Sequence, residues 1–249
     1  MKTNSFKNPI IVSEEKWLAA RLELLREEKE FTRLRDKLAD RRRKLPWIKI
    51  TKGYTFESSD GQVTLADLFE GRSQLIVQHF MFGPGWEQGC KSCSFMTDHF
   101  NAAAVHLPAR DVSFAVVSHA PIDTILPFKK RMGWNVNWVS AHGTDFNRDY
   151  HVSFTPEEMA QGKVHYNYGL RPFPVEEAPG VSVFARDVDG TIYHTYSTYG
   201  RGVEFIMGTY HILDLTPKGR DEKGLEYGME WLRHHDRYEF PNNAVAAKA

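Results

Sequence analysis

The spacing of apolar residues in the middle of the chain indicates alternating strands and helices. Residues 75–82 form an apolar run rich in β-branched and aromatic residues, which predicts a buried strand. Glycine and proline interrupt the run over residues 83–89, and helical spacing begins at Cys90. The next expected elements are a buried strand over 112–118, a helix over 121–132 and a short strand over 136–140. This order predicts parallel strands joined by right-handed crossovers.

Further elements are expected on both sides of this core. Residues 13–44 contain neither Gly nor Pro and begin with the good N-cap Ser13, so they predict a long helix that Pro46 stops. Its partial apolar stripe must pack on the domain or on a second subunit. The remaining expected elements are a short strand and a small helix over 54–71, a hairpin over 179–196, helices around 203–213 and 222–235, and a loose tail from Pro241.

Residues 141–178 show no clear periodicity. A polar loop packed by its own aromatic residues is the expected structure. A metal or substrate cluster is the alternative, since several titratable side chains occur together: His142, Asp145, Asp149, His151 and His165.

Composition narrows the classes of function. The 249 residues hold 32 basic and 32 acidic side chains, so the chain has no net charge that would favour nucleic acid or an acidic membrane. The first ten residues lack the apolar run of a secretory signal, and no segment approaches the ~18 to 20 apolar residues of a membrane span. We expect a cytoplasmic protein that binds neither nucleic acid nor membrane.

The two cysteines carry the clearest chemistry. Cys90 and Cys93 stand three residues apart where the helix is expected to begin. Free backbone N–H groups and the helix dipole stabilise a thiolate there, so Cys90 should be the more acidic thiol. Cys93 follows one turn later on the same helix face. The pattern predicts a reversible dithiol in which Cys90 attacks a disulfide and Cys93 resolves it, with no metal and no cofactor.

Three other interpretations of this stretch stay open. A zinc site would need histidine ligands such as His79 or His99, because the chain has no further cysteine. The two thiols could also be buried and inert. Finally, residues 83–89 could form a dinucleotide loop, although the last glycine stands one residue too late for the GxGxxG motif.

The CxxC helix, the preceding lead-in over 60–71 and the hairpin over 181–192 resemble the thioredoxin-like superfamily. The resemblance implies an α/β three-layer sandwich with a central mixed sheet and helices on both faces. It implies a domain over 47–220 with an insertion around 141–178, between an N-terminal helical extension over 1–46 and a C-terminal helix and tail over 221–249. Pro179 stands where thioredoxins carry a cis-proline facing the dithiol, so Pro179, Gly180 and Trp86 are expected to position the substrate.

A narrower resemblance rests on the LPW near residue 46 and on four longer motifs, FMFGPGWEQGCKSC, SFMTDHF, GTDFNRDY and HTYSTYGRG. These motifs are similar to an uncharacterised bacterial family labelled predicted dithiol-disulfide oxidoreductases, over roughly residues 10 to 220. The resemblance implies an enzyme acting on protein or small-molecule thiols and disulfides. The long N-terminal helix, outside the minimal fold, could join two copies into a homodimer.

Departures from the two resemblances define the alternatives. Lys91 and Ser92 replace the Gly-Pro of thioredoxin, and Lys91 either lowers the pKa of Cys90 or is a solvated helix residue. Peroxiredoxins carry Thr or Ser three residues before their reactive cysteine, where this chain has Glu87. A thiol peroxidase is therefore the second candidate function. A non-catalytic thioredoxin-like interaction module is the third.

Overall fold

The computed structural model describes residues 9–239. The chain divides into two compact units, Met1–Pro46 and Trp47–Ala249. The first unit contains the long helix α1, Glu14–Arg43, whose N-cap Ser13 accepts a hydrogen bond from the amide of Lys16. None of the side chains of α1 is buried. The expected long helix is therefore confirmed.

The second unit is built on a mixed sheet. Three parallel strands form its centre: β4 (Gln74–His79), β5 (Val112–Ser118) and β6 (Asn137–Ser140). The hairpin strands β9 (Gly180–Arg186) and β10 (Ile192–Tyr199) extend it, with β9 antiparallel to β4. The parallel core and the hairpin were both expected from the sequence, and both are confirmed.

Short strands complete the two edges of the sheet. β1 (Ile48–Lys49) pairs with β10, and β2 (Thr55–Ser58) joins β6 to β3 (Gly61–Thr64). The resulting order is β1-β10-β9-β4-β5-β6-β2-β3. The sequence pattern missed β1, which has only two residues.

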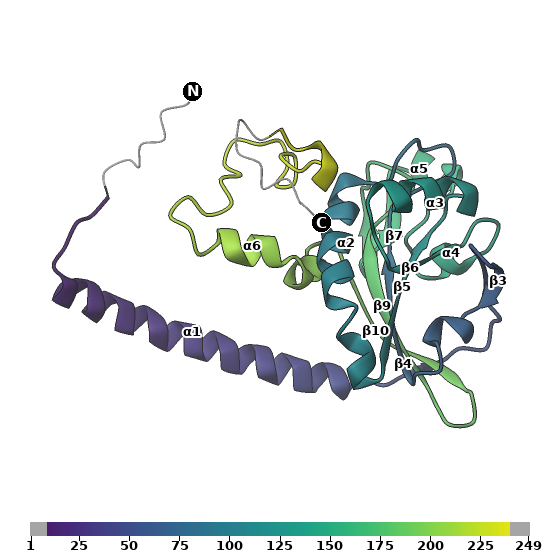
Figure 1. Cartoon of the computed structure of the whole chain (residues 1–249), viewed down its shortest axis with the longest axis horizontal. Helices are drawn as coiled ribbons and strands as arrows, with labels where there is room; N and C mark the ends of the chain where they lie inside the picture. The colour runs from purple at the N-terminus through teal and green to yellow at the C-terminus, as the bar shows by residue number, and fades with distance from the viewer. Residues whose placement is uncertain (1–8, 240–249) are drawn as a thin grey trace. The chain divides into compact units, whose positions relative to one another are not determined.

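Helices and turns cover both faces of the sheet. One buried cluster joins the sheet to α2 (Lys91–Ala103) and α3 (Ile122–Arg131). The other joins it to η1 (Asp67–Phe69) and α4 (Phe146–Asp149). Figure 1 shows α2 and α4 on opposite sides of the strands. This is the α/β, three-layer arrangement that the thioredoxin-like resemblance implies.

The segment 141–178 is packed by its own aromatic rings, since Phe154 and Tyr166 both lie against Phe173, with ring centroids 5.7 and 5.0 Å apart. Besides α4 it contains α5 (Pro156–Ala160) and a separate two-stranded sheet of β7 (Val164–Tyr166) and β8 (Gly169–Arg171). Asp145 and Asp149 bind the ammonium of Lys52 at 2.9 and 2.7 Å. Within residues 9–239, no three His, Cys, Asp or Glu side chains gather as metal ligands. The aromatic-packed loop is the interpretation that the structure supports.

The C-terminal part departs from the expected helices. η3 (Gly200–Ile206) and α6 (Gly208–Leu213) occupy the first expected helix. The second, over 222–235, is wrong: turns lead into the short η4 (His235–Arg237). Gly224 has a left-handed φ of +95°. Side chains of the segment bond to other helices: Glu222 accepts from Tyr210 of α6, and His235 pairs with Asp98 of α2. The expected tail from Pro241 lies outside the described residues.

Across residues 9–239, every helix is too short or too polar to cross a bilayer.

Candidate dithiol site

Cys90 is the N-cap residue of α2, and Cys93 lies in its first turn. The Cys90 amide donates to the Met81 carbonyl at 3.0 Å, and the Cys90 carbonyl accepts from the Ser94 amide at 2.9 Å. Both thiols are free. Cys90 is partly exposed, whereas Cys93 is 1% exposed. One thiol can therefore meet a substrate while the other stays covered.

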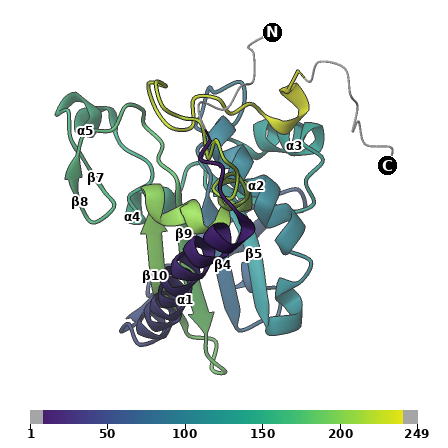
Figure 2. The same cartoon turned by 90° about the vertical axis from the view of Figure 1, so that its left-hand side faces the viewer.

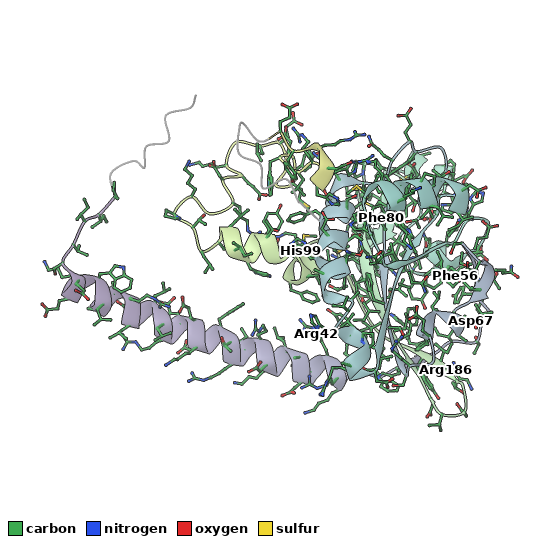
Figure 3. The ribbon with its side chains drawn as sticks, viewed as in Figure 1. Arg42, Phe56, Asp67, Phe80, His99 and Arg186 are labelled. Carbon is green, nitrogen blue, oxygen red and sulfur yellow. The ribbon has the colours of Figure 1, made fainter. Side chains whose placement is uncertain are left out.

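A glycine packed against the end of β4 sets the position of Cys90. A Cβ on Gly89 would lie 2.5 Å from the Phe80 ring, so no other residue fits this backbone path without displacing the ring. Figure 3 labels Phe80, and comparison with Figure 1 places it beside α2. The Gly89 carbonyl also bonds His234 Nε2 at 2.9 Å. The loop is thus held on both sides immediately before the nucleophile.

The pKa values of the two thiols move in opposite directions. The Cys93 thiol donates to the Cys90 sulfur, and this bond, with the N–H groups of Cys93 and Ser92 at the helix start, lowers the pKa of Cys90 to about 6. Burial raises the pKa of Cys93 well above its usual value, and the Cys90 and Glu177 charges add to the rise. At neutral pH the pair therefore holds one thiolate, at Cys90, and one thiol, at Cys93.

Sequence reasoning missed the buried carboxylate of Glu177. Glu177 is 2% exposed and accepts hydrogen bonds from His119 Nδ1 at 2.9 Å and from Ser153 Oγ at 2.7 Å. Nothing in its sequence position, two residues before Pro179, distinguished it from a surface glutamate. Only the fold brings it close enough to act on Cys93.

Lys91 does not match either of its two expected roles. Its ammonium donates to the Glu230 carbonyl at 2.7 Å and lies 5.6 Å from the centroid of the Tyr227 ring. Lys91 is not among the largest causes of the lowered pKa of Cys90. It instead attaches the C-terminal segment to the start of α2.

The three residues expected to position the substrate lie in different surroundings. Pro179 lines a cavity beside Cys93, but no peptide bond in residues 9–239 is cis, unlike the proline that the resemblance implied. Gly180 pairs with His79 and Tyr199 inside the sheet, and a Cβ there would lie 2.6 Å from the Tyr199 ring. Trp86 Nε1 donates to Glu176 at 2.6 Å, and Trp86 is not one of the residues that line the cavity. The structure therefore brings only Pro179 to the cavity that Cys93 lines.

The cavity has a volume of about 730 Å³, and no pattern in the sequence indicated it. Its walls come from α2, the loop at Met81, Pro179 and the C-terminal segment from Gly200 to Met229. Figures 1 and 2 show α6 and the chain that follows it on the α2 side of the sheet. The side chain of His99, a residue of α2, faces α6 (Figure 3), and its Nε2 accepts from the Thr209 amide at 3.0 Å.

The zinc interpretation finds no ligand set near the cysteines. His79 lies on the face of the sheet opposite the cysteines, where its Nε2 is 2.7 Å from Ser182 Oγ. Both ring nitrogens of His99 have protein partners. No other group in residues 9–239 joins Cys90 and Cys93 in a cluster of three metal-binding side chains. The residues present fit a dithiol.

Three of the solved structures that resemble this chain are a peroxiredoxin Q, a peroxidoxin and a thiol:disulfide interchange protein. A cysteine-to-serine mutant of peroxiredoxin Q from Xylella fastidiosa is 12% identical over 64% of this chain and 88% of that one, with a TM-score of 0.40. Peroxidoxin BcpB from Mycobacterium tuberculosis is 12% identical over 66% and 95%, with a TM-score of 0.40. A thiol:disulfide interchange protein from Bacteroides sp. is 14% identical over 70% and 95%, with a TM-score of 0.41.

Comparison by sequence gives a family. The profile of a family described as bacterial protein of unknown function (DUF899) matches residues 6–238. No match is found among curated proteins.

Proposed function

The chain belongs to the DUF899 family of bacterial proteins, and we propose that it is a thiol-disulfide oxidoreductase with Cys90 as nucleophile and Cys93 as resolving cysteine. One observation carries the proposal. A partly exposed thiol at a helix start has its pKa lowered to about 6, one turn before a buried thiol whose pKa is raised. This is the asymmetry that a two-step exchange requires.

The reaction follows from that asymmetry. The Cys90 thiolate attacks one sulfur of a disulfide, a mixed disulfide forms, and the other substrate sulfur leaves as a thiolate. Cys93 then loses its proton and attacks the Cys90 sulfur, which releases the second substrate thiol and leaves the Cys90–Cys93 disulfide. The protein loses two electrons and the substrate gains them. No cofactor is needed.

Trapping the intermediate tests these roles. We expect Cys93→Ser to accumulate a mixed disulfide at Cys90 when it is mixed with bis(2-hydroxyethyl) disulfide, as seen by intact-protein mass spectrometry. Cys90→Ser, the matched control, should trap nothing. A mixed disulfide at Cys93 in the Cys90→Ser variant, formed as fast as the one at Cys90, would contradict the assignment.

A thiol peroxidase is the second candidate, because a partly exposed thiolate is also what hydrogen peroxide oxidises. Cys93 would then condense with the Cys90 sulfenic acid. Against it, the position three residues before Cys90 holds an exposed glutamate, Glu87. Peroxide consumption measured beside disulfide reduction separates the two reactions.

We also propose the substrate class, the compartment and the assembly of the protein. The substrate is a protein or small-molecule thiol or disulfide, without nucleic acid or membrane as a partner. We place the reaction in the cytoplasm, where a lone CxxC pair is kept reduced. α1 is proposed to join two copies. If Cys90→Ser kept every biochemical effect of the protein while changes in α1 abolished it, the non-catalytic interaction module would replace the enzyme.

A further inference from the structure

The cavity beside Cys93 has the size and lining of a small-molecule site. Its volume of about 730 Å³ falls within the ~300 to 1,000 Å³ typical of ligand pockets. Four of the chain's seven methionines line it, and thioether side chains adapt to varied apolar ligands. These are Met81, Met96, Met207 and Met229. The same wall carries Ser92 and Cys93, whereas Cys90 is not one of the lining residues. Because the Cys93 thiol donates to the Cys90 sulfur, a ligand in the cavity lies next to the thiol that contacts the nucleophile.

The C-terminal segment covers one side of this cavity and is held there by hydrogen bonds. Tyr210 Oη donates to Glu222 at 2.8 Å, and Trp231 Nε1 donates to the same carboxylate oxygen at 2.9 Å. Lys91 holds the Glu230 carbonyl at 2.7 Å. A ligand must fit between this segment and α2, which favours a compact molecule.

The charges in the wall are balanced. Two are cations, Arg201 and Arg220, and two are carboxylates, Glu204 and Glu222. Arg201 and Arg220 both bind Glu204, at 3.1 and 2.8 Å. Arg220 also binds Asp214 at 2.8 Å. With its cations engaged by carboxylates, the wall favours an uncharged ligand over an anionic one.

Two main-chain groups next to the cavity, the Ala178 amide and the Pro179 carbonyl, already have hydrogen-bond partners. The Ala178 amide donates to the Val152 carbonyl at 2.8 Å, and the Pro179 carbonyl accepts from Tyr166 Oη at 2.7 Å. The next residues belong to β9, which is paired with β4 on one side and β10 on the other. A polypeptide that docks as an added strand needs a free edge. At Pro179 these groups offer none.

From these four observations we infer that the cavity binds the uncharged, apolar body of a low-molecular-weight organic disulfide, R–S–S–R. The inference rests on the proposed function and names its substrate class. Cys90 attacks one sulfur and releases R–S⁻. Cys93 then gives its proton to the released R–S⁻, and its thiolate attacks the Cys90 sulfur. The bond from Cys90 to the second sulfur of the substrate breaks, the second R–S⁻ leaves and the Cys90–Cys93 disulfide forms. A dithiol such as dithiothreitol reduces the protein again.

Two disulfides of equal length test the inference. Dipropyl disulfide and bis(2-hydroxyethyl) disulfide differ only in a terminal methyl or hydroxyl on each arm. Reduced full-length protein is mixed with each, quenched with N-ethylmaleimide and analysed by mass spectrometry for loss of the two thiols. We expect the apolar disulfide to oxidise the protein at least about tenfold faster, since its methyl groups enter an apolar wall. Insulin chain disulfides should react more slowly than either.

Met229→Gln tests whether the preference comes from the cavity. Met229 is partly exposed, so a side chain of similar length should fold in its place. We expect the preference for dipropyl disulfide to fall roughly three- to tenfold, because a polar amide replaces an apolar contact. Met159→Gln is the matched control, since Met159 is also partly exposed but lies on α5 outside the cavity.

The outcomes separate the two proposals. Equal rates with both small disulfides, an unchanged preference in Met229→Gln, or faster reaction with insulin would overturn the apolar substrate and leave the oxidoreductase standing. No oxidation of Cys90 and Cys93 by any disulfide would overturn the proposed function and this inference together. Preferential oxidation by dipropyl disulfide that weakens in Met229→Gln but not in Met159→Gln supports both.

Discussion

At the scale of single residues, the two cysteines differ because one is partly exposed and the other is buried. The Cys93 thiol is the largest cause of the lowered pKa of Cys90, ahead of the N–H groups at the helix start. Cys93 in turn keeps its proton because it is buried beside Glu177 and Cys90. Each thiol therefore depends on the other for its protonation state.

Removing the Cys93 thiol should therefore make Cys90 less acidic. In the wild type we expect the rate of Cys90 alkylation by iodoacetamide to rise with pH around a midpoint near 6, the pKa of the thiolate. Cys93→Ala should raise the midpoint by about one pH unit, which lowers the thiolate fraction and so slows alkylation at pH 6 by roughly fivefold. Cys93→Ser keeps a hydroxyl donor, so it should raise the midpoint by less than Cys93→Ala does. An unchanged midpoint in Cys93→Ala would show that the helix start alone sets this pKa.

His79 provides a pH dependence of stability at a second residue. It is fully buried, and burial lowers its pKa to about 3. Between pH ~6.5 and 3 the unfolded chain binds a proton that folded His79 does not, so its contribution to the unfolding free energy falls by about 1.4 kcal/mol per pH unit of acidification. Urea unfolding of wild type and His79→Gln between pH 6 and 4 measures this contribution. The slope against pH should be shallower in His79→Gln.

An exposed histidine serves as the control. His106→Gln should keep the wild-type slope, because its side chain lies at the surface. Equal slopes in wild type and His79→Gln would mean that His79 is protonated in the folded protein.

At the scale of elements, the site depends on close contacts at strand and helix ends. β4 leads into the loop that Gly89 packs against Phe80, and β9 begins with Gly180 packed against Tyr199. The sequence pattern predicted both elements. It assigned Gly180 to substrate positioning, whereas in the structure the missing side chain of Gly180 makes room for a ring in the core.

Gly180→Ala separates packing from catalysis. A Cβ 2.6 Å from the Tyr199 ring must displace it, so we expect a loss of about 1 to 3 kcal/mol in the free energy of unfolding by urea. The rate of Cys90 alkylation should stay within about twofold, since Gly180 does not line the cavity beside Cys93. Normal stability with slow disulfide reduction would instead support the positioning role.

At the scale of the whole molecule, α1 is the one helix or strand described within residues 9–46, and none of its side chains is buried. Large apolar side chains recur on it every seven residues and are exposed: Trp17, Leu24, Phe31 and Leu38. A seven-residue apolar repeat is typical of helices that pair with another helix. This spacing supports the proposed homodimer through α1.

Sedimentation of the full chain tests that dimer. We expect the wild type to sediment as a dimer and Leu24→Asp/Phe31→Asp as a monomer, because two charges in the apolar seam cost about 2 kcal/mol or more. Lys29→Asp, on the other side of the helix, should leave the dimer intact. A monomeric wild type would exclude α1 as a dimer interface at the concentration measured.

The sequence by itself determined the long helix, the central strands and helices, the hairpin, and the chemistry carried at the start of one helix. Local spacing is enough to show a helix that starts at Cys90, a thiolate favoured there and a second cysteine one turn later. It also indicated the parallel strands and the hairpin, because apolar periodicity reports burial on a face.

Tertiary structure alone decided everything that residues distant in the chain make together. Glu177 acts near Cys93, Lys91 turns to the Glu230 carbonyl, and methionines from residue 81 to residue 229 line one cavity. The segment 222–235 has no helix because side-chain contacts from α2 and α6 hold it as turns. Such contacts depend on distances in space, and spacing along the chain carries no record of them.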